Sequence, residues 1–423
     1  MDKTLDYINL KYTPTKNDLV VLYRVEPNKI SIETACEHLA AESSIGTWTE
    51  ISTMNPRVAK KLKPTVFSID KKTKMVKIAY TKDLFENANM PEILSSIAGN
   101  IFGMSVVKNL RLVDIYFPKS IVDSFKGPAF GIEGIRKLTR IKERPLVGTI
   151  IKPKVGLNEK EHAQVAYNAW VGGLDVVKDD ENLTSMSFNN FDLRVKETLN
   201  ARDIAERKTG EKKIYMPNVT AETTEMLRRA NLVKKQGGEY IMVDILTLGW
   251  SALQTLRDAN LGLVIHAHRA MHAAITRNPK HGISMLVLAK VTRLIGADQL
   301  HIGTAQVGKM TGEKDEVIDI ENAIEYSKTK STENTLGQNW QNIKTTLAVA
   351  SGGLHPGHIP KLLSKMGTNI VAQFGGGCHG HPQGTIAGAK AIRQATNAYM
   401  KKIPAKTYAK TAPELKCALE HWK

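Results

Sequence analysis

The chain has 423 residues, of which 42% are hydrophobic and 24% are charged, and its formal net charge is +17. This length allows two or three domains with a large core, and no apolar run of about 18 residues indicates a membrane span. The positive charge would suit a nucleic-acid binder, but no zinc-finger spacing or aromatic RNA-binding motif accompanies it, so we favour attraction of anionic substrates.

The cysteines and the first residues predict where the protein works. Cys36, Cys378 and Cys417 are few and scattered, which fits a reducing cytosol better than a disulfide framework. The start of the chain, residues 1–4, lacks the apolar segment of a secretory signal. We therefore expect a cytoplasmic protein that has no membrane partner.

The first part of the chain alternates strand and helix patterns irregularly. Apolar runs predict strands at residues 19–25, 65–69, 75–80 and 110–117, and helices at 31–40 and 91–98. Ser31 is placed to cap the first of these helices. The pattern predicts a small α+β domain of ferredoxin-like type over residues 1–125, with an antiparallel sheet and helices on one face.

From residue 146 onward the rhythm becomes regular. Eight short apolar runs predict strands at 146–151, 174–177, 214–216, 240–243, 263–265, 299–302, 347–350 and 370–374. Helical patterns lie between them, and one opens on a capping box at Asn158 and Glu161. Eight alternating units predict a (β/α)8 TIM barrel within residues 126–423, a range that also includes a short C-terminal helical tail. A doubly wound open sheet is the alternative, although no G-x-G-x-x-G follows the first strand.

Chemically unusual residues follow the predicted strands at their carboxyl ends, where barrels of this type keep their active sites. These residues are Lys152 and Lys154, then Lys178, Asp180 and Glu181, then His266, His268 and Arg269, then His301, and the glycine-rich turns at 351–353 and 375–377. Chemically reactive residues gathered at the carboxyl ends of the strands predict an enzyme.

The most informative of these stretches is Lys178-Asp179-Asp180-Glu181. Alternation along a strand directs Lys178 and Asp180 to the same side, and Glu181 can turn toward them. Two carboxylates suit a hard cation such as Mg²⁺, but an ammonium should repel it. That conflict disappears if Lys178 carries a carbamate formed with CO₂. An acidic surface turn with one salt bridge is the alternative.

The remaining groups predict phosphate binding. Glycine-rich turns after the last two strands expose N–H groups, and Arg269 can clamp a phosphate. Lys309, flanked by glycine in a loop after the sixth strand, reads as part of a lid that closes over an anion. A zinc pair at His266 and His268 is an alternative, although no further ligand spacing supports it.

Taken in order, these motifs resemble the large chain of ribulose-1,5-bisphosphate carboxylase/oxygenase (RuBisCO), in particular its archaeal form III group. The resemblance extends from the N-terminal domain to the end of the barrel. The matching segments are residues 42–48, 99–100, 148–157, 172–182, 266–272, 301–304, 308–310, 351–355 and 373–377.

The resemblance implies a Mg²⁺-dependent lyase that carboxylates ribulose 1,5-bisphosphate with CO₂ and water to two molecules of 3-phosphoglycerate, with O₂ as a competing substrate. Lys178 would be the carbamylated N6-carboxylysine, a ligand of Mg²⁺ with Asp180 and Glu181, and the base. It further implies catalytic roles for Lys152, His268, Lys309 and Glu42. The implied substrate and phosphate contacts are Thr47, Trp48, Asn100, Lys154, Arg269, His301, Ser351, Gly352, Gly353, Gln373, Gly375 and Gly376.

In the family, the N-terminal domain reaches the barrel of a partner subunit. The resemblance therefore implies a homodimer or a ring of dimers, without an expected small subunit, and a role in nucleoside or ribose-phosphate salvage. The alternatives are a RuBisCO-like enolase or isomerase acting on a phosphorylated keto-sugar-like substrate, and a non-catalytic nucleic-acid binder.

Overall fold

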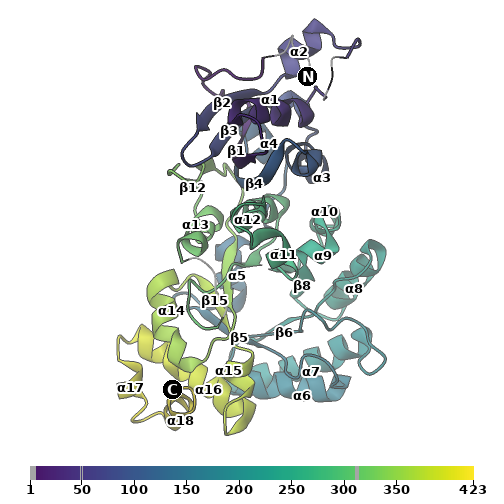
Figure 1. Ribbon diagram of the computed structural model, residues 1–423. Helices are drawn as coiled ribbons and strands as arrows, with labels where there is room; N and C mark the ends of the chain where they lie inside the picture. The colour runs from purple at the N-terminus through teal and green to yellow at the C-terminus, as the bar shows by residue number, and fades with distance from the viewer. Residues whose placement is uncertain (1–5, 48, 50, 310–313) are drawn as a thin grey trace. The chain divides into compact units, whose positions relative to one another are not determined.

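The computed structural model describes residues 6–47, 49, 51–309 and 314–423, and it divides into two compact units. The N-terminal unit consists of the chain up to Gly127 together with Met271–Ile295 and Tyr326–Ile343. The C-terminal unit consists of Pro128–Ala270, Gly296–Glu325 and Lys344–Lys423 (Figure 1). No helix within the described ranges combines the length and apolar composition that a membrane crossing requires.

The N-terminal unit is built on a five-stranded sheet in the order β10-β4-β1-β3-β2. Its strands are β1 (Asp18–Pro27), β2 (Thr65–Asp70), β3 (Met75–Thr81), β4 (Val107–Tyr116) and β10 (Gly282–Ile283), with β12 (Lys328–Thr329) and β13 (Gln338–Asn339) in a separate ribbon. The pairings among β1 to β4 are antiparallel, which confirms the predicted sheet, whereas β10 joins β4 in parallel.

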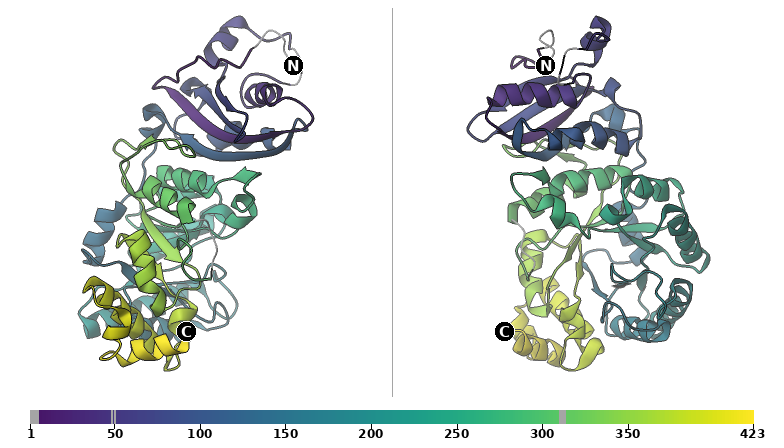
Figure 2. Two further views of the ribbon diagram at one scale, coloured as in Figure 1. Left: turned by 60° about the vertical axis from the view of Figure 1, so that its left-hand side comes forward. Right: turned by 45° about the vertical axis from the view of Figure 1, so that its right-hand side comes forward.

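The helices of this unit are α1 (Ile32–Glu42), α2 (Pro56–Leu62), α3 (Met90–Ala98), α4 (Lys119–Val122), α11 (His272–Thr276) and α12 (Met285–Ile295), with 3-10 turns η1 (Lys82–Leu84) and η2 (Asn100–Gly103). Figure 2 shows α1 lying against one face of the sheet. The predicted cap is confirmed, because the Ser31 hydroxyl accepts a hydrogen bond from Thr34 N–H at 3.0 Å.

The C-terminal unit contains a sheet of eight parallel strands in the order β7-β6-β5-β15-β14-β11-β9-β8. They are β5 (Leu146–Ile150), β6 (Val176–Lys178), β7 (Ile214–Met216), β8 (Tyr240–Asp244), β9 (Val264–His268), β11 (Gln299–His301), β14 (Leu347–Ser351) and β15 (Ile370–Gln373). The ring closes just beyond β7, where Met242 N–H donates to Pro217 O at 2.8 Å and Val219 N–H donates to Met242 O at 3.0 Å. This closure confirms the predicted barrel over an open doubly wound sheet.

Helices connect the strands of the barrel. They are α5 (Gly131–Thr139), α6 (Glu159–Val171), α7 (Phe191–Thr209), α8 (Thr223–Lys235), α9 (Ile245–Leu248), α10 (Trp250–Asp258), α13 (Lys314–Glu325), α14 (Ile359–Met366), α15 (Gly376–His379), α16 (Gly384–Met400), α17 (Ala405–Tyr408) and α18 (Pro413–His421), with the 3-10 turn η3 (Pro356–His358). The capping box predicted at Asn158 and Glu161 opens α6.

The barrel interior is filled with apolar side chains that alternate along the strands. The buried cluster takes Leu146, Val176, Ile214, Met216, Tyr240, Met242, Val264, Leu347, Val349 and Val371 from seven of the eight strands. Ile135 and Leu138 of α5 pack against this cluster. Because side chains two residues apart share a side of a strand, this interior layer fixes which later residues also face inward.

At the opposite ends of the strands from the candidate site, one buried carboxylate ties three segments together. Asp175, which is 1% exposed, accepts hydrogen bonds from Arg144 Nη1 and Nη2 at 2.6 and 2.8 Å and from Arg393 Nη2 at 3.1 Å. Burial alone would raise the pKa of Asp175, but the two guanidinium groups hold it below its ordinary value.

We therefore expect Asp175→Ala to lower the free energy of unfolding by about 3 kcal/mol at pH 7, because it leaves Arg144 without its partner. Since the folded-state pKa is depressed, the contribution is fully present above the ordinary carboxyl pKa of about 4 and is lost as pH falls below it. Denaturant unfolding at several pH values measures the effect, with Asp123→Ala, at an exposed aspartate directly after α4, as control. A difference from wild type that stays constant down to pH 3 would contradict this account.

Candidate active site

The Lys178–Glu181 turn lies at the carboxyl end of β6, inside the barrel. Val176 belongs to the interior layer, so Lys178, two residues later, also faces inward. The Lys178 side chain is buried, with 1% of its surface exposed. Its Nζ donates to Asp179 O at 2.7 Å and to Met242 Sδ at 3.2 Å, and lies 3.7 Å from Glu181 Oε2.

Burial of Lys178 favours the neutral form of its amine over the charged ammonium. Removal from water lowers the pKa of its ammonium, while the charges of Glu181 and Asp180 oppose that shift without cancelling it. The neutral amine, which is the nucleophilic form, is therefore more accessible here than on a surface lysine.

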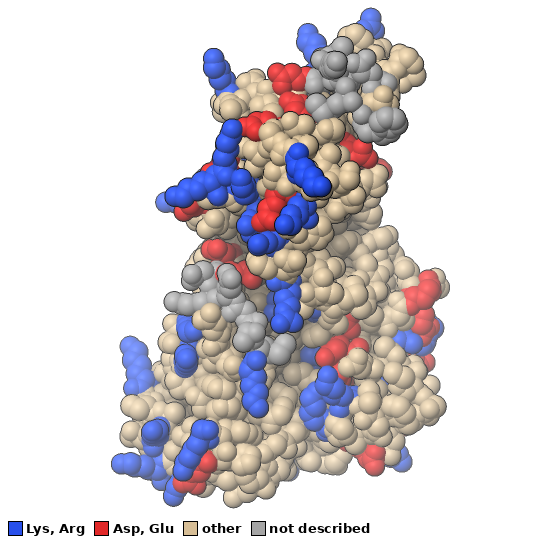
Figure 3. All heavy atoms as spheres, viewed as in Figure 1, with Lys and Arg blue, Asp and Glu red and all other residues tan. Residues whose placement is uncertain are grey.

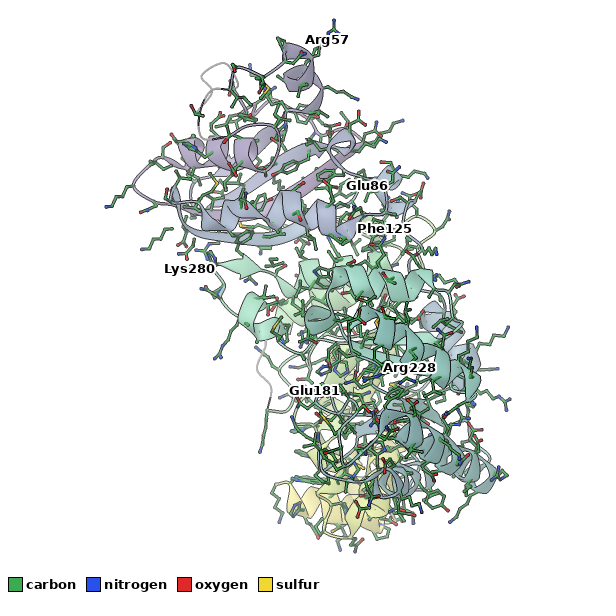
Figure 4. The ribbon with its side chains drawn as sticks, turned by 90° about the vertical axis from the view of Figure 1, so that its right-hand side faces the viewer. Arg57, Glu86, Phe125, Glu181, Arg228 and Lys280 are labelled. Atoms are coloured by element: carbon green, nitrogen blue, oxygen red, sulfur yellow. The ribbon has the colours of Figure 1, made fainter. Side chains whose placement is uncertain are left out.

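The two predicted carboxylates lie beside Lys178 and are paired with further lysines. Asp180 Oδ2 accepts from Lys152 Nζ at 2.8 Å, while Glu181 Oε1 lies 3.8 Å from Lys154 Nζ. Burial alone would raise the pKa of Glu181, but the positive charge of Lys178, with smaller contributions from His268 and Lys154, lowers it to about 2. Figure 4 labels Glu181 within this unit. Pairwise contacts thus join Lys152 to Asp180, and Lys154 and Lys178 to Glu181, at this end of the barrel.

This donor set fits a divalent cation on one condition. Within the described residues, no three His, Cys, Asp or Glu side chains are grouped so as to hold a metal ion. Asp180 and Glu181 could supply two ligands, and a third would have to come from elsewhere. A carboxylate added to the Lys178 amine would provide it and would also remove the repelling charge.

The third carboxylate of the turn, Asp179, faces the other way and was not assigned a role from the sequence. It is fully buried and accepts hydrogen bonds from Tyr215 Oη at 2.7 Å, from Asn218 N–H at 3.0 Å and from Arg194 Nε at 3.1 Å. These contacts, despite burial, keep its pKa well below the ordinary range. They fix the turn so that its neighbours on either side point into the barrel.

Two histidines form a buried, neutral pair. His266 Nδ1 lies 2.7 Å from Gln299 Oε1, and its Nε2 lies 2.9 Å from His301 Nε2. Burial lowers the pKa of His266 to about 3 and that of His301 well below its ordinary value. His266 and His268 share the inner side of β9 as alternation predicted, but His266 is committed to Gln299 and His301, so the structure gives no support to a zinc pair.

His268 has a different partner. Its Nδ1 lies 2.6 Å from Oδ1 of Asp244, and its Nε2 lies 3.8 Å from Glu181 Oε2. The Asp244 carboxylate is 3% exposed. Asp244 is a site residue that was not predicted from the sequence, although its position two residues after the inward-facing Met242 could have identified it.

The loop after β11 packs directly on the glycine turn after β14. Gly353 has a φ of +64°, and a Cβ there would lie 2.7 Å from Lys309 Cβ and 2.9 Å from Lys309 N. The structure thus brings exposed Lys309 next to Gly352 and Gly353. The next residues of the predicted lid, 310–313, lie outside the described residues.

The remaining predicted contacts of the barrel surround the same end. Gly375 lies beside Lys152, whose Cε would be 3.2 Å from an added Cβ, and Gly376 borders open space. Arg269 lies near Gly303, and burial lowers its pKa to about 10. Ser351, half-buried, ends β14 two residues after the interior Val349.

Gln373 stands out among the inward-facing groups. It is 1% exposed, and neither its amide oxygen nor its amide nitrogen has a hydrogen-bond partner within the described part of the chain. An unsatisfied buried amide costs free energy, about 1–3 kcal/mol, that a bound polar ligand would offset.

The other predicted residues belong to the N-terminal unit. Asn100 Nδ2 donates to Glu42 Oε1 at 3.4 Å, so these two residues lie together. Thr47 is half-buried, and Trp48 lies outside the described residues.

Comparison with protein families gave two matches that together span nearly the whole chain. Residues 6–121 match the model of the ribulose bisphosphate carboxylase large chain, N-terminal domain. Residues 131–422 match that of the ribulose bisphosphate carboxylase large chain, catalytic domain.

Individual relatives match over their full lengths. The chain is 53% identical over 423 residues to the ribulose bisphosphate carboxylase of Methanosarcina mazei, with 99% of each chain covered. It is 50% identical over 428 residues to that of Methanocaldococcus jannaschii, with 99% of this chain and 100% of the relative covered.

Solved structures agree with the sequence comparisons. A dimeric archaeal Rubisco from Hyperthermus butylicus superposes with a TM-score of 0.93 at 44% identity, with 98% of each chain covered. An octameric Rubisco from Pyrococcus horikoshii, in complex with sulfate, gives a TM-score of 0.91 at 46% identity, with 98% of this chain and 96% of that chain covered.

Proposed function

The chain belongs to the ribulose bisphosphate carboxylase large-chain family, with relatives of archaeal type, and on that basis we propose that it carboxylates ribulose 1,5-bisphosphate. CO₂ and water are consumed, two molecules of 3-phosphoglycerate are formed, and O₂ competes with CO₂. The observation that carries the proposal is the buried Lys178 amine, held beside the carboxylates of Asp180 and Glu181 at the mouth of the barrel.

Lys178 is the proposed site of activation. Its neutral amine attacks the carbon of CO₂, an N–C bond forms, and the nitrogen releases a proton. The product is a carbamate, N6-carboxylysine, which is anionic where the ammonium was cationic. The lowered pKa of Lys178 supports this step, because burial favours the amine form that reacts.

The carbamate oxygen of Lys178 would hold Mg²⁺ together with Asp180 and Glu181. When bound, this ion supplies Lewis-acid stabilisation of negative charge on the substrate oxygens. The carbamate also serves as the base that removes the C3 proton of the substrate, so that Lys178 contributes to both binding and enolisation.

Other side chains at the barrel mouth carry protons and charge. Lys152, paired with Asp180 at 2.8 Å, protonates the carbanion left after C–C cleavage, and the neighbouring Lys154 assists it. His268 handles the proton released on hydration. Lys309 orients the added CO₂ from the loop beside Gly353.

The two phosphates are proposed to bind at separate groups of residues. Arg269, His301 and Ser351 would hold one. The other would be held by Thr47, Trp48, Gly353, Gly375 and Gly376, with Gly352 and Gln373 contributing at the same barrel end. Lys and Arg side chains are spread over the visible face in Figure 3 with Asp and Glu among them, which favours attraction of small anions over a single nucleic-acid track.

We further propose a homodimer or a ring of dimers without a small subunit. Residues 1–125 would form the N-terminal domain and residues 126–423 the catalytic barrel and tail. Glu42 and Asn100 would complete the site of the partner subunit. The similar structures from H. butylicus and P. horikoshii are dimeric and octameric, which supports this part of the proposal.

The proposed setting is the cytoplasm, in ribose-phosphate salvage that feeds 3-phosphoglycerate into central carbon metabolism. Cys36, Cys378 and Cys417 are all free, as expected in a reducing compartment. The archaeal origin of the relatives supports a salvage role.

Incubation with ribulose bisphosphate, Mg²⁺ and ¹⁴CO₂ tests the reaction. Acid-stable label in 3-phosphoglycerate is expected. Substrate turnover without acid-stable label would favour a RuBisCO-like enolase or isomerase instead. Salt-sensitive binding to DNA or RNA with no Mg²⁺-dependent turnover would favour a nucleic-acid binder.

We expect Lys178→Ala to abolish carboxylation, a loss of about 1,000-fold or more, because the base and a cation ligand disappear together. The far-UV spectrum and melting temperature should stay close to wild type, and the ¹³C carbamate signal should be absent. Lys196→Ala, on the exposed side of α7, is the matched control and should retain both activity and signal. Substantial carboxylation by Lys178→Ala would rule out the assignment.

Lys309→Ala should separate the partial reactions. Exchange of the C3 proton with solvent should continue, because Lys178 and its carboxylates are untouched, whereas carboxylation should fall by about 100-fold as the added CO₂ loses its orienting cation. Lys361→Ala on α14 controls for removal of an exposed lysine. Equal losses of exchange and carboxylation would instead place Lys309 in substrate binding.

A further inference from the structure

We propose that Asp244 is a positioning residue for His268, which fixes the imidazole with its proton on Nδ1 and leaves Nε2 as a proton acceptor facing the Lys178 site. The assignment of the tautomer stands on geometry alone. The use of Nε2 in catalysis rests on the proposed function.

The register of the barrel creates the pair. Asp244 and His268 are direct partners in the parallel pairing of β8 with β9. Both follow interior residues by two positions, Asp244 after Met242 and His268 after His266, so both side chains turn inward. As a result Asp244 Oδ1 lies 2.6 Å from His268 Nδ1 in a position that is almost closed to water, with Asp244 3% exposed.

The Asp244 carboxylate contacts His268 and does not cap the helix that follows it. Asp244 occupies the N-cap position of α9, where an aspartate usually accepts hydrogen bonds from the first turn. Its side chain makes no such bond. Its backbone N–H donates to Thr220 Oγ1 at 3.0 Å, and its backbone carbonyl accepts from Thr247 Oγ1 at 3.3 Å. A carboxylate only accepts hydrogen bonds, so the short contact places the imidazole proton on Nδ1.

The second nitrogen is then directed at the reaction centre. His268 Nε2 lies 3.8 Å from Glu181 Oε2, on the side of the proposed cation ligands. The neighbouring His301 does not occupy it through its own Nε2, which lies 2.9 Å from His266 Nε2. Without a partner on Nδ1, the imidazole could carry its proton on either nitrogen, and molecules with Nε2–H could not accept a proton.

This arrangement serves the proton transfer that accompanies hydration of the carboxylated intermediate. Water adds to the C3 carbonyl: a C–O bond forms, the carbonyl π bond breaks with its electron pair moving to the C3 oxygen as an alkoxide, and the water loses one proton to the lone pair of His268 Nε2. The resulting imidazolium keeps its Nδ1–H bond to Asp244, whose negative charge stabilises it, and the proton then passes to solvent. Asp244 itself exchanges no proton and touches no substrate.

Asp244→Asn is the sharpest substitution, because it keeps the size of the side chain but can donate to Nδ1 as well as accept from it. We expect the kcat for carboxylation to fall by about 100-fold, whereas C3 proton exchange, which needs only the Lys178 site, is retained. Asp123→Asn, at an exposed aspartate directly after α4, should change neither rate. Equal losses of exchange and carboxylation, or no loss of either, would overturn the proposal.

The tautomer itself is measured on the wild-type protein labelled with [¹⁵N]histidine, so the test does not depend on the folding of a variant. The His268 signals are assigned by their absence in His268→Gln. A protonated Nδ1 and an unprotonated Nε2 are expected, with a mixed population in Asp244→Asn. A wild-type signal showing Nε2–H would overturn the proposal.

The carboxylase function and the positioning role of Asp244 can be refuted independently of each other. If wild type fixes no ¹⁴CO₂, the proposed function fails, and the NMR experiment alone decides the tautomer. If wild type fixes CO₂ but Asp244→Asn does so at the same rate, the role of Asp244 fails while the carboxylase assignment stands.

Discussion

Burial of one lysine amine beside two anionic carboxylates is the constraint around which the C-terminal end of the barrel is arranged. A buried ammonium needs partners for three protons. Lys178 has a backbone carbonyl and a thioether within 3.2 Å, and its nearest Glu181 oxygen is 3.7 Å away. The ammonium form of Lys178 is therefore incompletely hydrogen-bonded. Converting it to an anionic carbamate beside a bound cation would remove an unfavourable buried positive charge from the site. The positive charge of Lys178 holds the pKa of Glu181 low, and Lys152 pairs with Asp180 at 2.8 Å.

Much of this arrangement could be predicted from the sequence because strands are short-range structures with a fixed period. The apolar runs identified all eight barrel strands, and the period of two directed Lys178 and Asp180 to one side and placed His266 beside His268 on another strand. The site roles expected of Asn100 and Glu42 came from the family resemblance alone. The hydrogen bond between them was not predicted, since no local pattern joins residues so far apart in the chain.

The parts that could not be predicted depend on partners from distant segments. Asp244 reads in sequence as an ordinary helix cap, and only the register of β8 against β9 gives it His268 instead. Asp179 had no role predicted from the sequence, and its hydrogen bonds to Arg194, Tyr215 and Asn218 become visible only in the folded chain. β10 has two residues and little pattern of its own, so its place beside β4 follows from tertiary pairing.

Because the eight strands form a closed ring, the reactive groups come from several separate stretches of sequence. Inward side chains from different strands form a shared layer, and that layer exists only when the strands are in register. The opposite rim, where Asp175 and Arg144 join neighbouring segments, carries none of those groups. Loops on that rim are consequently the place where foreign peptides could be spliced in, or the molecule attached to a support, without disturbing the reactive end.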